Sequence, residues 1–175
     1  MVRAKCVIIF GAKNMAISIG DTLPEANFAI MTDDGPGPFN LNEFAAGKKV
    51  VLFGVPGAFT PTCHGNHLPG FLDNLSSFTE KGVDAVAVVS VNDPFVMEQW
   101  AIATGGSGKI HFLADGAAHF SKAIGMDLDL SDFGMGVRSA RYSMVIDNGK
   151  VTHLNVENTP KEATASGAAA LLEAL

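Results

Sequence analysis

Two apolar runs constrain the fold of this chain more than any other feature. They are KVVLFGV at residues 49–55 and VDAVAVVSV at residues 83–91. Neither run keeps up the strict alternation of apolar and polar residues that marks a strand with one solvated face. Each therefore predicts a buried strand inside a sheet that carries helices on both faces.

Helical patterns follow both runs. Apolar side chains recur at helical spacing after the first run, at Leu68, Phe71, Leu72, Leu75 and Phe78. Pro69 within this pattern predicts a kink, because it lacks the N–H that continues a helical ladder. After the second run, Asp93 is expected to cap a helix with Pro94 in its first turn, and Gly105 and Gly106 are expected to end it.

Turn signals organise the rest of the chain. TDDGPGP at residues 32–38 and Asn148-Gly149 each predict the turn of a hairpin. The other expected elements are a short helix capped by Asn40 or Asn42, a strand at 110–114, a short helix at 117–124 and a last helix opened by a capping box at 159–162. This order predicts an α/β protein with a thioredoxin-like fold, in which helices flank a mixed central sheet that carries an N-terminal hairpin and an insertion.

The composition favours one globular domain. The 175 residues are 47% hydrophobic and 17% charged, which suits a chain with a sizeable core. The net charge of -6, without a dense Lys/Arg cluster, argues against a nucleic-acid partner. The longest apolar runs are too short to cross a membrane. We therefore expect residues 15–175 to form a single domain with neither kind of partner.

Residues 1–14 differ from the rest, because they contain three basic and no acidic residues. Their apolar run, Cys6 to Phe10, is shorter than the roughly 7–15 residues of a signal peptide, and no small-residue cleavage site follows. A short targeting extension, an extra edge strand and a start upstream of the natural one remain open. We expect a disordered or accessory extension, with Met15 opening the domain.

The chain has two cysteines, Cys6 and Cys63. There is no C-x-x-C, no Cys/His cluster at zinc spacing and no dense disulfide framework. The five histidines show no H-x-x-x-H pattern. We therefore expect no metal and a reducing, cytoplasmic compartment.

Cys63 lies in the stretch PGAFTPTCHGNHLPGF at residues 56–71, directly after the first buried strand. It is expected just before or inside the first turn of a helix, where unpaired N–H groups and the helix dipole favour the reactive thiolate. Thr60, three residues earlier, brings a hydroxyl within reach of the sulfur, and Pro61 pre-organises the turn.

His67, one turn after Cys63, is better placed than His64 to transfer a proton, although a capping or packing role for His67 is the alternative. A weakly basic leaving group needs little help from a general acid. Peroxide cleavage therefore suits this site better than peptide hydrolysis.

The spacing of Pro56, Thr60 and Cys63 resembles the active-site signature of the peroxiredoxins. GVPGAFTPTC and HLPGF resemble their atypical fifth subfamily, which includes the type II enzymes and belongs to the AhpC-TSA/redoxin superfamily. The similarity extends to VNDPFVMEQW at 91–100, LAD at 113–115 and RYSMVIDNGKVTHLNVE at 141–157.

The resemblance implies a thiol peroxidase with no metal or organic cofactor, which forms homodimers through the face bearing the active-site loop. Cys63 would be the peroxidatic cysteine, oxidised to a sulfenic acid by hydrogen peroxide or an alkyl hydroperoxide. Thr60 would hydrogen-bond the thiolate and the peroxide, and Pro56 would wall the pocket. Arg141 would stabilise the thiolate and the transition state. Arg138 is close in sequence but outside the motif position.

The tail departs from this pattern. Several members of the subfamily carry a second, resolving cysteine there, whereas NTPKEATASGAAALLEAL at 158–175 contains none. The sulfenic acid would then be reduced by glutathione, glutaredoxin or thioredoxin, or by Cys6 if that segment can reach it. By analogy with one-cysteine members, we favour glutathione or glutaredoxin.

The sequence leaves two other functions open. A cysteine hydrolase or acyl transferase would use His67 as its base, and a redox sensor or binding module would be oxidised without turnover. Trp100 and Phe95 are expected in the core or at an interface.

Overall fold

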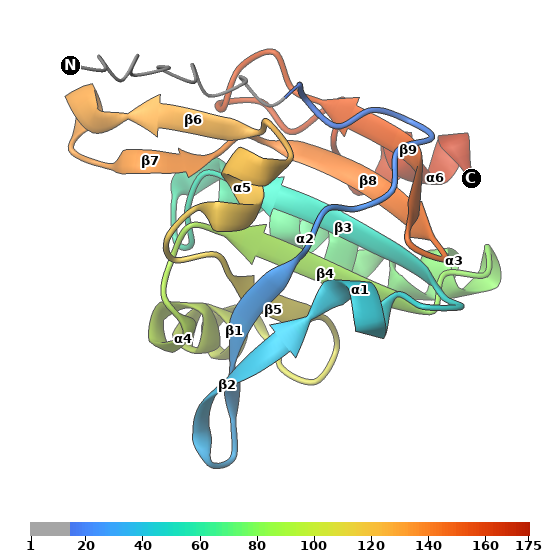
Figure 1. Ribbon diagram of the computed structural model, residues 1–175, viewed down its shortest axis with the longest axis horizontal. Helices are drawn as coiled ribbons and strands as arrows, with labels where there is room; N and C mark the ends of the chain where they lie inside the picture. The colour runs from blue at the N-terminus through green and yellow to red at the C-terminus, as the bar shows by residue number, and fades with distance from the viewer. Residues whose placement is uncertain (1–14) are drawn as a thin grey trace, which may run out of the picture.

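A seven-stranded mixed sheet lies at the centre of the fold (Figure 1). The computed structural model describes residues 15–175, so the expected N-terminal extension and Cys6 lie outside the described residues. The strands follow the order β2-β1-β5-β4-β3-β8-β9 across the sheet. Their bounds are β1 Asn27–Thr32, β2 Gly35–Asn40, β3 Lys49–Val55, β4 Ala85–Ser90, β5 His111–Ala114, β8 Tyr142–Asp147 and β9 Lys150–Val156.

The two apolar runs form interior strands, as predicted. β3 pairs in parallel with β4 on one side and antiparallel with β8 on the other, and β4 pairs in parallel with β5. The predicted strand at 110–114 and both hairpins are also present, as β5, β1–β2 and β8–β9. This mixed sheet confirms the α/β, thioredoxin-like fold class.

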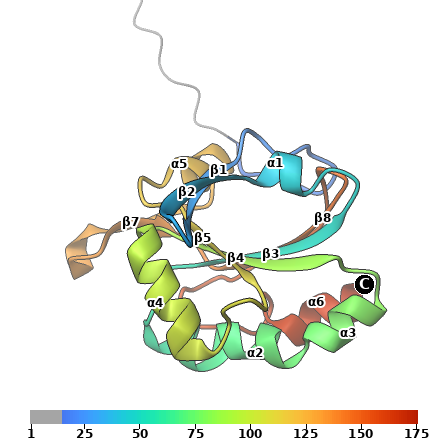
Figure 2. The same ribbon diagram turned by 90° about the horizontal axis from the view of Figure 1, so that it is seen from below.

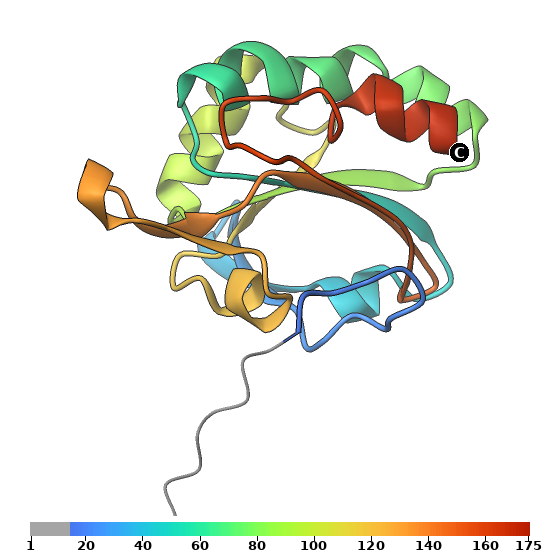
Figure 3. The ribbon, with the colours of Figure 1, turned by 90° about the horizontal axis from the view of Figure 1, so that it is seen from above.

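Helices cover both faces of the sheet (Figures 2 and 3). One face carries α2 Leu68–Asp73, α3 Leu75–Glu80, α4 Pro94–Thr104 and α6 Ala168–Ala174, and the other carries α1 Leu41–Phe44 and α5 His119–Ala123. Within residues 15–175, no helix is long and apolar enough to cross a membrane.

Side chains of β3 alternate between two cores. Val51 and Phe53 join the core under α2, α3, α4 and α6, and Phe53 stacks on Phe71 of α2 with ring centroids 4.0 Å apart. Val50 and Leu52 join the core on the opposite face. Fully burying a side chain of this size contributes about 1.5–3 kcal/mol, so β3 is anchored from both sides before the chain reaches the site.

Local signals place most element ends correctly. Asp93 caps α4 by accepting a hydrogen bond from the N–H of Val96, and Gly105 ends this helix in the left-handed region at φ 68°. Asn40, rather than Asn42, caps α1. Asn148 and Gly149 have φ values of 47° and 79°, the turn conformation that this pair favours.

The helix after β3 is less regular than its apolar spacing predicts. It includes a π-helical segment, η1 Cys63–His67, in which the N–H of Leu68 donates to the carbonyl of Cys63. Pro69 follows directly, and a proline lacks the donor that a regular helix needs at this point. The predicted irregularity therefore takes the form of a π segment. A second interruption, at Asn74, separates α2 from α3.

The prediction that Thr159–Glu162 opens the last helix is wrong. Thr159–Glu162 does not open a helix, and α6 begins only at Ala168. The carbonyl of Pro160 instead accepts hydrogen bonds from the side chain of Arg141. This tertiary contact holds the segment as a loop and outweighs the local capping pattern.

A small two-stranded ribbon was not expected from the sequence. It consists of β6 Asp127–Leu130, the 3-10 turn η2 Ser131–Phe133 and β7 Gly136–Ser139. The ribbon projects from one end of the molecule, beside the start of β8 (Figure 1). Its strands are half exposed, so they lack the apolar runs that reveal the central strands.

Candidate active site

Cys63 is fully buried at the start of the helix that follows β3. The N–H of His64 donates to the carbonyl of Thr60 at 2.9 Å, which closes the first turn around the cysteine. Cys63 is therefore inside the first turn, where the positive end of the helix favours an anionic sulfur. The π segment that begins at this residue is a feature often found at functional sites.

Arg141 brings a buried positive charge to this sulfur. Its Nη2 atom lies 3.3 Å from Sγ of Cys63, and the arginine is only 2% exposed. Nη2 and Nε also donate to the carbonyl of Pro160, at 2.8 Å and 3.2 Å. The guanidinium is thus held by the loop before α6, in a position where its charge would stabilise a thiolate.

The pairing of β3 with β8 explains this meeting. Gly54, near the end of β3, lies opposite Tyr142, the first residue of β8. Cys63 follows the end of β3, and Arg141 precedes β8, so both belong to the same end of the sheet. The register of two strands therefore unites residues that are 78 positions apart.

Thr60 lies beside the cysteine but does not donate to it. Its Oγ1 donates to the carbonyl of Gly57 at 2.8 Å. A hydroxyl has one proton to donate, so the expected hydrogen bond to the thiolate is not formed here. The lone pairs of Oγ1 stay available to accept from an O–H group.

A hollow of about 430 Å³ opens at this end of the sheet. Pro56, Thr60 and Arg141 contribute to its walls, whereas Cys63 is not among the residues that line it. The other lining residues are Pro61, Thr62, Leu130, Phe133, Met135, Pro160 and Lys161. Leu130, Phe133 and Met135 belong to the unexpected β6–β7 ribbon, which therefore gives the hollow an apolar wall.

Both ring nitrogens of His67 are engaged by groups other than the sulfur of Cys63. Nδ1 lies 3.1 Å from Nη1 of Arg141, and Nε2 lies 2.9 Å from the carbonyl oxygen of Ser166. Burial, together with the charge of Arg141, lowers the pKa of His67 to about 4. The ring also packs edge-on against Phe53. This confirms the packing alternative, and His67 is not placed to pass a proton to Cys63.

The other aromatic and basic candidates lie outside the site. Trp100 is buried and donates from Nε1 to Nδ1 of the half-buried His64, whereas Phe95 is 60% exposed. Arg138 donates to the carbonyls of Met135 and Val91 and makes no contact with the sulfur.

Several residues that build the site were missed from the sequence. They are Pro160, Ser166 and Glu157, which surround Arg141 and His67, and Asn92, whose Oδ1 accepts from the N–H of Ala58 in the loop before Cys63. Glu157 and Asn92 both lie in sequence blocks that resemble the peroxiredoxins, and this resemblance is the signal that could have identified them as site residues. No local pattern marks Pro160 or Ser166.

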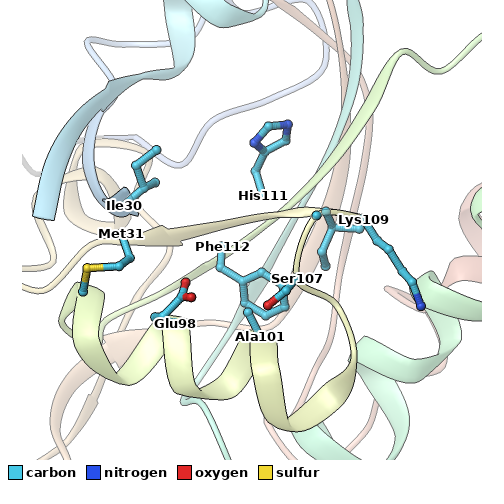
Figure 4. Close-up of a pocket in the computed structure, with 10 residues that line it drawn as sticks. Ile30, Met31, Glu98, Ala101, Ser107, Lys109, His111 and Phe112 are labelled. Atoms are coloured by element: carbon cyan, nitrogen blue, oxygen red, sulfur yellow. The ribbon is translucent and has the colours of Figure 1, made fainter. Parts of the chain in front are cut away.

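A second hollow, of about 300 Å³, lies between the β1–β2 hairpin, α4 and β5 (Figure 4). Its walls include Met31, Glu98, Lys109 and Phe112. None of the predicted site residues lines it, so it is separate from the hollow beside Arg141.

Comparisons with known proteins place the chain in a family. The family model described as Redoxin matches residues 18–172. Peroxiredoxin-2C of Oryza sativa subsp. japonica is 47% identical over 160 residues, which cover 91% of this chain and 98% of the relative. This chain is a peroxiredoxin.

Further similarities agree with this assignment. Peroxiredoxin-2D of Arabidopsis thaliana is 43% identical over 160 residues, 91% of this chain and 98% of the relative. The crystal structure of reduced Prx3 from Vibrio vulnificus in complex with H2O2 is 50% identical, with a TM-score of 0.85, and the match covers 90% of this chain and 98% of that one. The resemblance stated from the motifs is thus confirmed, and this peroxiredoxin has the thiol peroxidase and antioxidant function of its family.

Proposed function

We propose that Cys63 is the peroxidatic cysteine of this peroxiredoxin. Its thiolate attacks one oxygen of hydrogen peroxide or an alkyl hydroperoxide, so that an S–O bond forms while the O–O bond breaks. The sulfur is oxidised to sulfenic acid, and the peroxide is reduced to water or an alcohol after the departing oxygen takes up a proton. No metal or organic cofactor enters this reaction.

One observation supports this proposal most strongly, namely the distance of 3.3 Å between Sγ of Cys63 and Nη2 of Arg141, a residue that lines an apolar hollow. The guanidinium stabilises the attacking thiolate. It also faces the negative charge that develops on the departing oxygen. Thr60 Oγ1, whose proton is committed to Gly57, accepts from the O–H of the peroxide, and Pro56 limits the access of water.

We further propose a one-cysteine cycle with an external thiol. Cys63 is the only cysteine in residues 15–175, and it is buried. A first thiol condenses with the sulfenic acid to form a mixed disulfide and water. A second thiol then releases Cys63 as a thiol and leaves as a disulfide. Glutathione with glutaredoxin is the favoured reductant, with thioredoxin as the alternative.

Oxidation of the purified protein by stoichiometric hydrogen peroxide tests the first step. A sulfenic-acid probe should label Cys63 in the wild-type protein and nothing in Cys63→Ser. Absence of labelling in the wild type would refute the peroxidatic role of Cys63. Oxidation without turnover under any thiol reductant would instead favour a redox sensor.

The reductant is tested by turnover with glutathione and glutaredoxin or with thioredoxin, in wild-type protein and Cys6→Ser. We expect turnover with glutathione and glutaredoxin that does not change in the variant. A Cys6–Cys63 disulfide after peroxide treatment would overturn the one-cysteine cycle.

A cysteine hydrolase is a poorer explanation of this site. Such an enzyme needs a base beside the nucleophile, and both nitrogens of His67 are engaged by Arg141 and Ser166.

We also propose that the protein forms homodimers through the face bearing the active-site loop, where Phe59 is 49% exposed, and that it works in the reducing cytoplasm. Sedimentation of the purified protein tests the dimer.

A further inference from the structure

A line of hydrogen bonds continues from Arg141 away from Cys63. Arg141 Nη1 lies 3.1 Å from Nδ1 of His67, and Nε2 of the same ring lies 2.9 Å from the carbonyl oxygen and 3.2 Å from Oγ of Ser166. The N–H and Oγ of Ser166 lie 2.8 Å and 3.0 Å from Oε1 of Glu157. His67, Arg141 and Ser166 are each at most 2% exposed.

The carbonyl of Ser166, which can only accept, and the carboxylate of Glu157 together determine the direction of these bonds. An ionised carboxylate only accepts hydrogen bonds, so Ser166 donates its hydroxyl proton to Glu157. The serine then presents only lone pairs to His67, from its hydroxyl and from its carbonyl. Nε2 of His67 must therefore carry the ring proton, because it faces two acceptors.

This tautomer determines whether the Nδ1 atom that faces Arg141 is a hydrogen-bond donor or an acceptor. A neutral imidazole with its proton on Nε2 has an unprotonated Nδ1. Arginine can only donate, so an acceptor at Nδ1 holds Nη1 and thereby orients Nη2 toward the sulfur. The opposite tautomer would place two donors against each other. Glu157 is also joined directly to the arginine backbone, since its N–H donates to the carbonyl of Arg141 at 3.0 Å.

We propose that Glu157 and Ser166 are positioning residues, which act through the tautomer of His67 to aim the guanidinium of Arg141 at Cys63. This inference rests on the proposed role of Cys63 as the attacking thiolate. Neither residue touches the sulfur in the structure, so their contribution is orientation rather than contact with substrate. The charged groups around His67 in this arrangement are Arg141 and Glu157.

Glu157→Ala tests the proposal, with Glu157→Gln as the conservative variant and Glu162→Ala as the control. Glu162 is an exposed residue of the same loop. Two rates are measured for each protein, namely alkylation of Cys63 by iodoacetamide at neutral pH and oxidation of Cys63 by hydrogen peroxide. Alkylation reports thiolate availability without any peroxide.

We expect both rates to fall roughly tenfold in Glu157→Ala, which is the effect typical of losing a group that orients a functional side chain. In Ser166→Ala, both rates should fall several-fold. Glu157→Gln keeps an acceptor oxygen and should recover most of the rate, and Glu162→Ala should match the wild type. Folded Glu157→Ala with unchanged rates would overturn the proposal, even if its melting temperature fell.

Nitrogen NMR of His67 in the wild-type protein provides a readout that does not depend on variant folding. The expected spectrum has the proton on Nε2 and an unprotonated Nδ1, and a proton on Nδ1 would overturn the proposal. If the wild-type protein failed to react with peroxide, the proposed function would fall. The alkylation rates of the variants would still decide whether Glu157 and Ser166 position Arg141.

Discussion

Arg141 and Cys63 meet at 3.3 Å although they are 78 positions apart in the chain. Arginine offers a planar fork of donors, and here the fork is shared between the sulfur, the ring of His67 and the carbonyl of Pro160. One side chain therefore links the helix after β3, the start of β8 and the loop before α6. We expect the activity of the site to depend on the fork rather than on a positive charge alone.

Arg141→Lys should slow the oxidation of Cys63 by hydrogen peroxide by roughly 10²–10³-fold, because lysine keeps the charge but cannot make these contacts at once. Rapid mixing with hydrogen peroxide, followed by sulfenic-acid labelling, measures the rate. Arg138→Lys is the matched control, since Arg138 does not contact the sulfur, and it should change the rate far less. Equal rates in the two variants would contradict a special role for Arg141.

Stability should fall as pH falls between about 6.5 and 4, because of His67. Its pKa is lowered from 6.5 to about 4 in the folded protein, so the unfolded chain binds more protons in this window and acid favours unfolding. The linked loss is about 3 kcal/mol and should level off below the folded pKa.

Urea denaturation at several pH values measures this effect. Acidic residues add their own dependence, so the informative quantity is the difference between wild-type protein and His67→Asn. The variant should have a shallower dependence in this window. A difference that stays constant from pH 6.5 to 4 would show that His67 titrates normally.

Gly54→Ala should destabilise the protein by about 1–3 kcal/mol or more. A Cβ atom on Gly54 would overlap with Cε1 of Tyr142 on the paired strand, and both residues lie in the buried sheet. The clash would also displace Arg141, which precedes Tyr142. Thermal denaturation and the rate of Cys63 oxidation measure the two effects.

Gly70→Ala is the matched control for this substitution. Gly70 lies in α2, and a Cβ atom there would meet nothing within 4 Å. The variant should be more stable by about 0.5–1 kcal/mol, because alanine favours the helix more than glycine does. A loss of stability in Gly70→Ala equal to that in Gly54→Ala would contradict the steric explanation.

Phe133→Ser should weaken the reaction with a bulky organic hydroperoxide more than the reaction with hydrogen peroxide. Phe133 is 78% exposed on the ribbon and lines the hollow beside Arg141. Its ring offers apolar contact to a cumyl group, which hydrogen peroxide lacks. We expect a several-fold higher KM for cumene hydroperoxide. Steady-state kinetics with both peroxides measure this, and a parallel change for both would indicate a general disturbance.

The sequence was informative wherever the signal was local. Apolar runs revealed β3 and β4, Asp93 and Gly105 bounded α4, and Asn148-Gly149 formed the expected turn. The capping pattern at Thr159–Glu162 was misleading, because a tertiary contact to Pro160 outweighed it. The ribbon of β6 and β7 was not predicted, because its half-exposed strands carry no strong apolar pattern.

The amino-acid sequence by itself determined the sheet, the position of Cys63 at the start of a helix and the motif that ties Pro56, Thr60 and Arg141 to it. Only the tertiary structure decided that Arg141 donates to the carbonyl of Pro160, and that Ser166 meets His67 across 99 positions. The physical reason is range, because propensity and capping act over a few residues. The partners of a buried arginine or histidine depend on how distant strands and loops pack together.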